Sequence, residues 1–513
     1  MIIIGEKNLT LDDFYKILFE EEKIDLCPNA LKKVQQNFDF LENFSKNKVI
    51  YGINTCFGPM AQYKISETDQ KALQYNLIRS HASGSGNPIP NIYGKALMLA
   101  RLNSFMRGYS GVHPDAVHLL KDFINLDIYP KVFEHGGVGA SGDLVQLAHL
   151  ALNLIGEGEV WYKGEFRTTQ EVFKETKLTP LKVYLREGLA IINGTSCMTG
   201  TGLINLIHAK NLLNWAVISS TIINEVVESY DDHFSKELNQ VKLHEGQNLI
   251  AAEMRKITES SKLIKKRADH LYNGNIQVGL IKDKVQEYYS LRCVPQILGP
   301  VYETIKGVEK ILINEINSVN DNPIIDKENR DVFHGGNFHG DYVSLEMDKL
   351  KIVTTKMSML IERQLNYLYN DKQNEKFPPF ANLGTLGLNL GMQAAQFTAT
   401  STTAENQTLS NPMYVHSIPN NNDNQDVVSM GTNAALITKK VVENTVEVMA
   451  IEYISLLQII DYMKFQDKLS ETSKKIYQEM RAIVPVFYED APIYPHIENI
   501  KQYLLKNRPN RIK

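Results

Sequence analysis

The tripeptide Ala140-Ser141-Gly142 has a residue order that can support unusual chemistry. If the backbone nitrogen of Gly142 attacks the carbonyl carbon of Ala140, a five-membered ring closes. Loss of two water molecules then converts Ser141 into a dehydroalanine. Glycine supplies an unhindered nitrogen and lets the chain bend tightly, because it has no Cβ. Alanine keeps the attacked carbonyl accessible, and serine carries the hydroxyl group that leaves. The product, a 4-methylidene-imidazol-5-one, is a strong electrophile that needs no external cofactor.

Two other interpretations of this glycine-rich segment have to be weighed. Residues 137–142 (GVGASG) match the dinucleotide-binding pattern G-x-G-x-x-G, but that pattern requires a buried strand directly before it and a βαβ unit around it. The preceding residues 130–135 (PKVFEH) make a poor strand. A simpler alternative is a turn leading into a helix, with Ser141 or Asp143 as the N-cap. Locally, the capped turn and the self-made electrophile both remain open.

The elements that must position this segment are mainly helices. Residues 201–230 contain no Pro and, after Gly202, no Gly, and their apolar residues recur every three or four positions, which predicts a long helix. Similar runs cover about 297–318, 342–370 and 431–464. Helices that are apolar on several sides pack centrally in a bundle. We therefore expect a mainly α fold in which a loop-rich N-terminal domain carries the tripeptide. The expected divisions are 1–200, a central long-helix bundle at 201–464, and a C-terminal helical segment at 465–513.

The composition excludes several classes of protein. The net charge is -4, from 55 basic and 59 acidic residues, which gives no reason to expect a nucleic-acid partner. The N-terminal residues resemble neither a signal peptide nor an anchor, and no run of about 18 apolar residues predicts a membrane span. The cysteines, Cys27, Cys56, Cys197 and Cys293, are isolated and have no metal-ligand spacing, so we expect free thiols, no metal and a cytoplasmic location.

Further polar segments carry a resemblance that covers essentially the whole chain. With its G-x-G-A-S-G-D-L loop, the sequence resembles the histidine/phenylalanine/tyrosine ammonia-lyase family, and most of all the bacterial, flavobacterial-type tyrosine ammonia-lyases. The matching segments fall in the family's order: Tyr51–Gly58 (YGINTCFG), Leu73–His81 (LQYNLIRSH), Asn193-Gly194-Thr195, Tyr289–Gln296 (YSLRCVPQ), Asn320–Pro323 (NDNP), Gly335–Phe338 (GGNF) and Asn424–Asp426 (NQD). Cys56 departs from the pattern, which has Gly at that position.

The resemblance implies an elimination of ammonia helped by the electrophile at Ser141. It makes Tyr51 the base that removes the β-proton of the substrate. A phenol with a pKa near 10 is a poor base at neutral pH, so we expect its site to lower that pKa. Tyr289 resembles a second catalytic phenol, which contacts the electrophile or the leaving amine. Arg292 is expected to bind the α-carboxylate through its planar guanidinium group.

The remaining predicted binding residues have roles that rest mainly on the resemblance. Asn193 and Asn337 are expected to contact the oxygen of the electrophile and the substrate carboxylate, as in an oxyanion hole. Phe338 is expected to form a wall of the ring pocket. The resemblance also implies a homotetramer in which several chains share each active site.

Two positions bear on the substrate, which is expected to be an aromatic amino acid. His81 matches the residue that faces the polar end of the side chain in tyrosine and histidine lyases, where phenylalanine lyases carry an apolar residue. Gln425 lies where histidine lyases have Glu. Together they favour conversion of L-tyrosine to trans-p-coumarate and ammonia. The alternatives are a histidine ammonia-lyase that forms urocanate, a tyrosine 2,3-aminomutase that re-adds ammonia at the β-carbon, and a catalytically silent homologue.

Overall fold

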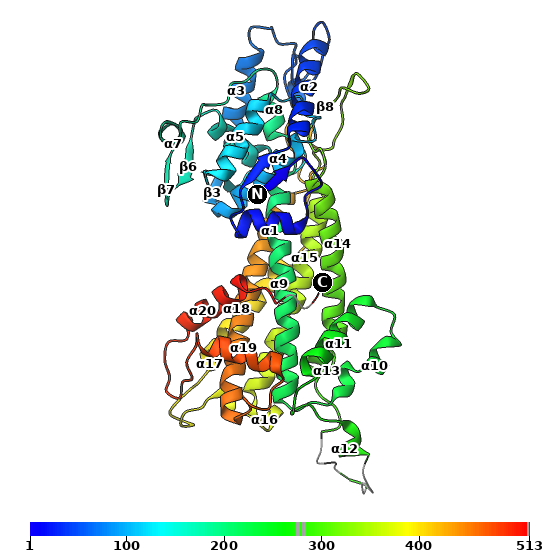
Figure 1. The fold of residues 1–513 in the computed structure, drawn as a ribbon, viewed down its shortest axis with the longest axis vertical. Helices are drawn as coiled ribbons and strands as arrows, with labels where there is room; N and C mark the ends of the chain where they lie inside the picture. Colours follow the sequence, from blue (N-terminus) through cyan, green and yellow to red (C-terminus); the bar gives the residue numbers. More distant parts are fainter. Residues whose placement is uncertain (273–277, 280, 282–283, 510–511, 513) are drawn as a thin grey trace. The chain divides into compact units, whose positions relative to one another are not determined.

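The computed structural model describes residues 1–272, 278–279, 281, 284–509 and 512. The described chain is mainly helical, with short strands, as its periodicity predicts (Figure 1). It divides into two compact units. The first comprises Met1–Ile207, Val308–Lys349 and Pro412–Lys439, and the second comprises His208–Gly307, Leu350–Asn411 and Lys440–Lys513.

Four long helices have residues in both units, and each lies where the sequence predicts one. They are α9 (Ser196–Val226), α14 (Val294–Ile316), α15 (Asp341–Tyr369) and α18 (Gly431–Met463). Helix α9 is buried along almost its whole length, which explains why its apolar residues do not follow a single face. The prediction of a mainly α fold with long core helices is confirmed. The three-part division at residues 200 and 464 stays a prediction.

The rest of the first unit consists of shorter helices and small sheets. Its helices are α1 (Leu11–Phe19), α2 (Pro28–Phe44), α3 (Gln70–His81), α4 (Asn91–Phe105), α5 (Pro114–Asn125), α6 (Leu144–Leu154), α7 (Thr169–Thr176) and α8 (Glu187–Ile192). Its strands are β1 (Ile2–Ile4), β2 (Ile24–Leu26), β3 (Ser85–Pro88), β4 (Tyr129–Pro130), β5 (Phe133–His135), β6 (Glu159–Tyr162), β7 (Glu165–Thr168), β8 (Ile324–Asp326) and β9 (Asp331–Phe333). The β1–β2 pair is parallel, and the β3–β5, β4–β6–β7 and β8–β9 pairings are antiparallel.

Three of these helices pack against one another and position the predicted chemistry. Helices α3, α6 and α8 are mutual neighbours, and α3 and α8 lie close together near the α2 end of the unit in Figure 1. Helix α3 ends at His81, α6 begins just after the tripeptide, and α8 ends just before Asn193. The packing of three helices therefore brings together segments that are more than 50 residues apart in the sequence.

The second unit is helical throughout its described elements. Besides its parts of the four long helices it contains α10 (Lys236–Gln240), α11 (Glu245–Thr258), α12 (Arg267–Leu271), α13 (Tyr289–Arg292), α16 (Asp371–Asn374), α17 (Gln393–Leu409), α19 (Glu471–Arg481) and α20 (Tyr494–Lys506). In the described part of the chain, no helix combines the length and the apolar composition that crossing a bilayer requires.

A buried carboxyl group on α18 gives the second unit a pH-dependent stability. Glu452 is fully buried, and burial raises its pKa to about 8, which the nearby Ser219 hydroxyl only partly opposes. Below pH 4.5 both the folded and the unfolded states are protonated. Above it only the unfolded state ionises, so the free energy of unfolding falls by roughly 1.4 kcal/mol for each pH unit up to about pH 8.

We therefore expect Glu452→Gln, which cannot ionise, to raise the thermal unfolding midpoint above that of the wild type by more at pH 8 than at pH 5. Glu443→Gln, on the exposed side of the same helix, is the control and should show no such pH dependence. Equal differences for Glu452→Gln at both pH values would contradict this assignment.

Candidate active site

The tripeptide lies in a loop whose backbone requires glycine at two positions. Gly139 and Gly142 have φ angles of +76° and +73°. Gly142 pairs with Gly194 in a parallel bridge, so that a Cβ on Gly142 would lie 2.0 Å from the carbonyl oxygen of Gly194. Ala140 is buried. The tight bend and the absence of side-chain bulk at Gly142 are what closure of a methylidene-imidazolone ring at this segment requires, so the residues fit that group.

Asp143 fixes the end of this loop to another helix. Its fully buried carboxylate accepts the N–H groups of Cys197 and Met198, at 2.8 and 2.9 Å, and the hydroxyl of Thr432. Cys197 and Met198 belong to the first turn of α9, where unpaired N–H groups and the helix dipole favour an anion. Burial raises the pKa of Asp143 to about 6, against the effect of its three hydrogen bonds and the charge of Arg101. Asp143 therefore occupies the N-cap position of α6 without capping it, because its side chain binds α9 instead.

A cavity of about 390 Å³ brings five of the predicted site residues together. Tyr51, His81, Ser141, Asn193 and Gln425 all line it. The other lining residues are Cys56, Phe57, Gly58, Pro59, Met60, Leu73, Asn76, Leu77, Ser80, Leu144, Leu189, Ile192, Asn421, Asn422 and Asn424. Within the described residues this lining contains no Asp, Glu, Lys or Arg. The cavity is thus suited to a ring that carries no charge.

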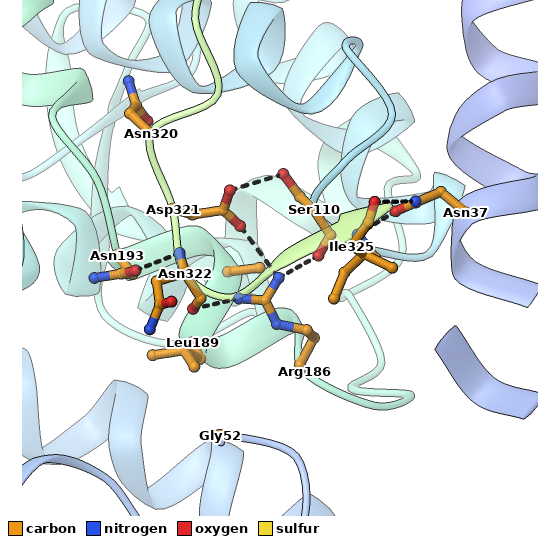
Figure 2. Close-up of polar contacts among 12 residues, drawn as sticks. Asn37, Gly52, Ser110, Arg186, Leu189, Asn193, Asn320, Asp321, Asn322 and Ile325 are labelled. Carbon is orange, nitrogen blue, oxygen red and sulfur yellow. Dashed lines mark hydrogen bonds and ion pairs between the residues drawn. The ribbon is translucent and has the colours of Figure 1, made fainter. Parts of the chain in front are cut away.

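Two amide side chains hold Ser141 in place. Gln425 Nε2 donates to Ser141 Oγ over 3.0 Å, and Asn193 Nδ2 donates to the Ser141 carbonyl oxygen over 3.0 Å. Asn193 is itself fixed, because its Oδ1 accepts the backbone N–H of Asn322 at 2.8 Å (Figure 2). The Asn193 donor is therefore preorganised toward an oxygen of the tripeptide, as the electrophile hypothesis requires.

Tyr51 lies in this cavity, but its surroundings change its pKa in the direction opposite to the one expected. Burial raises the pKa of the phenol. The backbone N–H of Gly58, which donates to the Tyr51 hydroxyl over 3.1 Å, and the charge of Arg186 both lower it without reversing the shift. The expectation of a lowered pKa was wrong for the groups that this chain places around Tyr51, because desolvation, together with the neighbouring Cys56, outweighs the Gly58 hydrogen bond and the charge of Arg186.

His81 ends helix α3 with a defined tautomer. Its Nδ1 lies 3.0 Å from the carbonyl oxygen of Leu77, which can only accept, and 3.1 Å from Ser80 Oγ. Because the Ser80 hydroxyl itself donates to the Leu77 carbonyl oxygen, a proton on Nδ1 is the arrangement that satisfies both contacts. Burial lowers the pKa of the imidazole below its ordinary value of 6.5. His81 is therefore neutral at physiological pH, and its Nε2 is left as a hydrogen-bond acceptor.

Two buried arginines, Arg101 and Arg186, support the cavity residue Asn193 and the segment Asn320–Pro323, and the sequence analysis did not predict either of them. Arg186 donates to the carboxylate of Asp321 at 3.1 Å and to the carbonyl oxygens of Asn322, at 2.8 Å, and Ser110 (Figure 2). Arg101 donates to Asn320 Oδ1 at 2.9 Å and to the Asn193 carbonyl oxygen at 3.1 Å. The segment Asn320–Pro323 was recognised as a motif, but its arginine partners lie 135 or more residues away and had no local signal.

Ala140 and Gly142 flank Ser141 without lining this cavity, and four further predicted site residues do not line it either. Asn337 lines a second cavity of the first unit, of about 690 Å³, and donates to the carbonyl oxygen of Val319 at 3.4 Å. Phe338 is adjacent to it in the chain and lines neither cavity. Tyr289 and Arg292 belong to helix α13 of the second unit, where the guanidinium lies 4.8 Å from the centroid of the Tyr289 ring. The roles assigned to these four residues stay predictions.

The fold and the tripeptide loop define a class of enzyme that builds its electrophile from its own backbone, and comparison with known proteins agrees. The family model described as aromatic amino acid lyase matches residues 9–482. A tyrosine 2,3-aminomutase of Chondromyces crocatus is 36% identical over 508 residues, covering 98% of this chain and 96% of that protein. A histidine ammonia-lyase of Bacillus cereus is 35% identical over 508 residues, covering 99% and 97%.

Solved structures give the same result. The crystal structure of a tyrosine aminomutase from Streptomyces globisporus superimposes with a TM-score of 0.94 at 33% identity, covering 98% of this chain and 96% of that one. The chain belongs to the histidine/phenylalanine/tyrosine ammonia-lyase family. It is a carbon–nitrogen ammonia-lyase-type enzyme of this aromatic amino acid ammonia-lyase and aminomutase family, which uses the autocatalytically formed methylidene-imidazolone and no external cofactor.

The geometry of the loop predicts the outcome of substitutions within it. We expect the intact mass of the wild type to be two waters below its sequence mass, and Ser141→Ala to abolish both this loss and turnover. Gly142→Ala should also retain the full mass, because its Cβ would overlap Gly194 and its φ of +73° is strained for alanine. Gly307→Ala is a matched control, since a Cβ there meets no atom within 4 Å. An unmodified wild-type mass would contradict the cyclisation.

Proposed function

We propose that this enzyme removes ammonia from L-tyrosine to give trans-p-coumarate. The observation that carries the proposal is the neutral His81, whose Nε2 is free to accept in the same uncharged cavity as Ser141 and Tyr51. A phenol hydroxyl at the end of the substrate ring would donate to this nitrogen. A cavity built to accept a substrate hydroxyl discriminates strongly against an analogue that lacks it, because the acceptor would otherwise remain unpaired.

The residues of the cavity have complementary roles in this reaction. The methylidene-imidazolone, once formed, supplies the electrophile that makes the amino group a better leaving group. Asn193 keeps the tripeptide in place through the Ser141 carbonyl oxygen. Gln425 Nε2 binds Ser141 Oγ before cyclisation, and because that oxygen leaves as water, its N–H is then available to the substrate in the cavity. Tyr51 takes the β-proton, and the N–H of Gly58 stabilises the phenolate form needed for that step. The apolar side chains of Leu73, Leu77 and Leu144 pack around the ring.

The α-carboxylate of the substrate needs a cation that this cavity lacks. Arg292 is suited to this role, because its Nε is buried and has no hydrogen-bond partner among the described residues. We propose that the enzyme acts as a homotetramer in which subunits share active sites, so that Arg292, Tyr289, Asn337 and Phe338 complete the site. The guanidinium would bind the carboxylate through two parallel hydrogen bonds.

Two other activities have support from the relatives. The first relative is named a tyrosine 2,3-aminomutase, so its name gives the amino acid proposed as the substrate here. The histidine ammonia-lyase is almost as similar to this chain in sequence. Gln425, where histidine lyases have Glu, and the uncharged lining favour a phenol over an imidazolium. An aminomutase differs from a lyase in how long the product is retained, which depends on the closure of loops over the site.

Purified enzyme should be incubated separately with tyrosine, phenylalanine and histidine, and the ultraviolet bands of coumarate, cinnamate and urocanate recorded. Chromatography of the tyrosine reaction should also quantify β-tyrosine. We expect coumarate as the main product. Urocanate forming faster than coumarate would establish the histidine lyase, and β-tyrosine as the main product would establish the aminomutase.

Substitution of His81 tests the specificity. We expect His81→Phe to lower the tyrosine-to-phenylalanine ratio of kcat/KM by at least about tenfold, since a phenol hydroxyl would be left unpaired against an apolar ring. In the wild type this ratio should stay constant down to pH 6.5 and fall only below it, because the lowered pKa keeps His81 neutral and able to accept. A ratio unchanged in His81→Phe would remove His81 from the recognition of the substrate.

A further inference from the structure

Gln74 lies at the junction of the three segments that carry Tyr51, His81 and Asn193. It sits in the middle of α3, seven residues before His81, and its side chain is fully buried. A buried amide has two N–H donors and one oxygen acceptor that need hydrogen-bond partners, so those partners identify the segments that Gln74 positions. Both partners are backbone groups of the active-site segments.

The first partner is the loop of the proposed base. Gln74 Nε2 donates to the carbonyl oxygen of Gly52 over 2.9 Å, and Gly52 directly follows Tyr51. Gly52 has a φ of +73°, and a Cβ there would lie 2.2 Å from Leu189 Cδ2, so the backbone of this loop is packed directly against α8. In Figure 2, Gly52 is labelled at the bottom, below Leu189.

The second partner is the start of α8. Gln74 Oε1 accepts the backbone N–H of Leu189 over 2.8 Å, one of the first-turn N–H groups that have no acceptor within the helix. Gly188 makes room for this contact, because a Cβ there would lie 2.8 Å from Gln74 Oε1. Helix α8 has only six residues, and its C-cap is Asn193, which donates to the tripeptide. A rigid helix of this length transmits the position of its first turn to Asn193.

We propose that Gln74 is a positioning residue that sets the place of the Tyr51 phenol and of the Asn193 amide relative to Ser141. The inference rests on the proposed role of Tyr51 as the base. Gln74 does not line the cavity, so it acts through the backbone of the Tyr51 loop and of α8. Because proton removal depends on the distance between base and carbon, loss of the Gln74 contacts should slow the chemical step more than it weakens substrate binding.

The Gln74→Glu variant distinguishes a positioning role from a purely structural one by the pH dependence of its kcat. At low pH the introduced carboxyl group is protonated, and it can donate to Gly52 and accept from Leu189 as the amide does. Burial raises the pKa of this carboxyl group. As the pH rises above that pKa, the group loses its proton and can no longer donate a hydrogen bond to the Gly52 carbonyl oxygen. The ratio of kcat between variant and wild type should therefore be near one at pH 6 and fall by about 10- to 100-fold by pH 9.

Two further variants complete the experiment. Gln74→Met removes both hydrogen bonds at similar volume, and it should lower kcat by about 100-fold at every pH while KM changes by less than about threefold. Gln70→Glu, the same substitution one turn earlier on α3, is the matched control and should follow the wild type. All kcat values should be divided by the fraction of protein that has lost two waters, measured by intact mass, which removes any effect on formation of the electrophile.

A kcat ratio for Gln74→Glu that does not change with pH would overturn the proposal, whether the ratio is one or uniformly low. Gln74→Met that changes only KM, or only the thermal midpoint, would also overturn it. Gln74→Glu keeps the shape of the amide, so the test stands even where Gln74→Met does not fold. If the wild type acts on another amino acid in place of tyrosine, the proposed substrate fails, and the same ratios measured with that amino acid still decide the role of Gln74.

Discussion

The close approach of Gly142 to Gly194 is the constraint on which the rest of the site depends. The N–H of Asp143 donates to the Gly194 carbonyl oxygen at 2.8 Å, and neither glycine has room for a Cβ. This contact joins the tripeptide loop to the turn between α8 and α9. It therefore places Asn193 beside the Ser141 carbonyl oxygen and brings the Asp143 carboxylate to the first turn of α9. A side chain at either glycine would separate the electrophile from the groups that orient it.

The described residues that line the cavity carry no charged side chain, whereas the residues that support them include a buried cluster of charged groups. Arg101, Arg186 and Asp321 are fully buried, and each has polar partners that fix its position. Removing one member of such a set is costly, because it leaves the opposite charge buried and uncompensated. The consequence for the site is that the carbonyl oxygens of Asn193 and Asn322 are held by buried, hydrogen-bonded arginines. Preorganised dipoles of this kind stabilise developing charge without having to reorient.

The same scaffold serves enzymes with different outcomes, so substrate and product fate depend on differences within a shared fold. The named relatives include a tyrosine aminomutase and a histidine ammonia-lyase at nearly equal identity. In this chain, the hydrogen bond from His81 Nδ1 to Leu77 leaves Nε2 as an acceptor, which is the basis of the proposed recognition of the ring substituent. Gln74, two turns earlier, connects the same helix to the proposed base. In the proposed function, helix α3 thus links recognition of the substrate to the geometry of proton removal.

The sequence by itself determined the reaction class and the helical architecture. Locally, Ala140-Ser141-Gly142 left a capped turn and a self-made electrophile open, and the further segments that resemble the family decided between them. The long helices follow from local periodicity. Tertiary structure decided which of the flagged residues meet, since Asn193 and Gln425 reach Ser141 whereas Asn337 lines another cavity. It also decided the raised pKa of Tyr51 and revealed Arg101, Arg186 and Gln74 as supports. Burial and contacts between segments tens to hundreds of residues apart are properties of packing, and no local pattern encodes them.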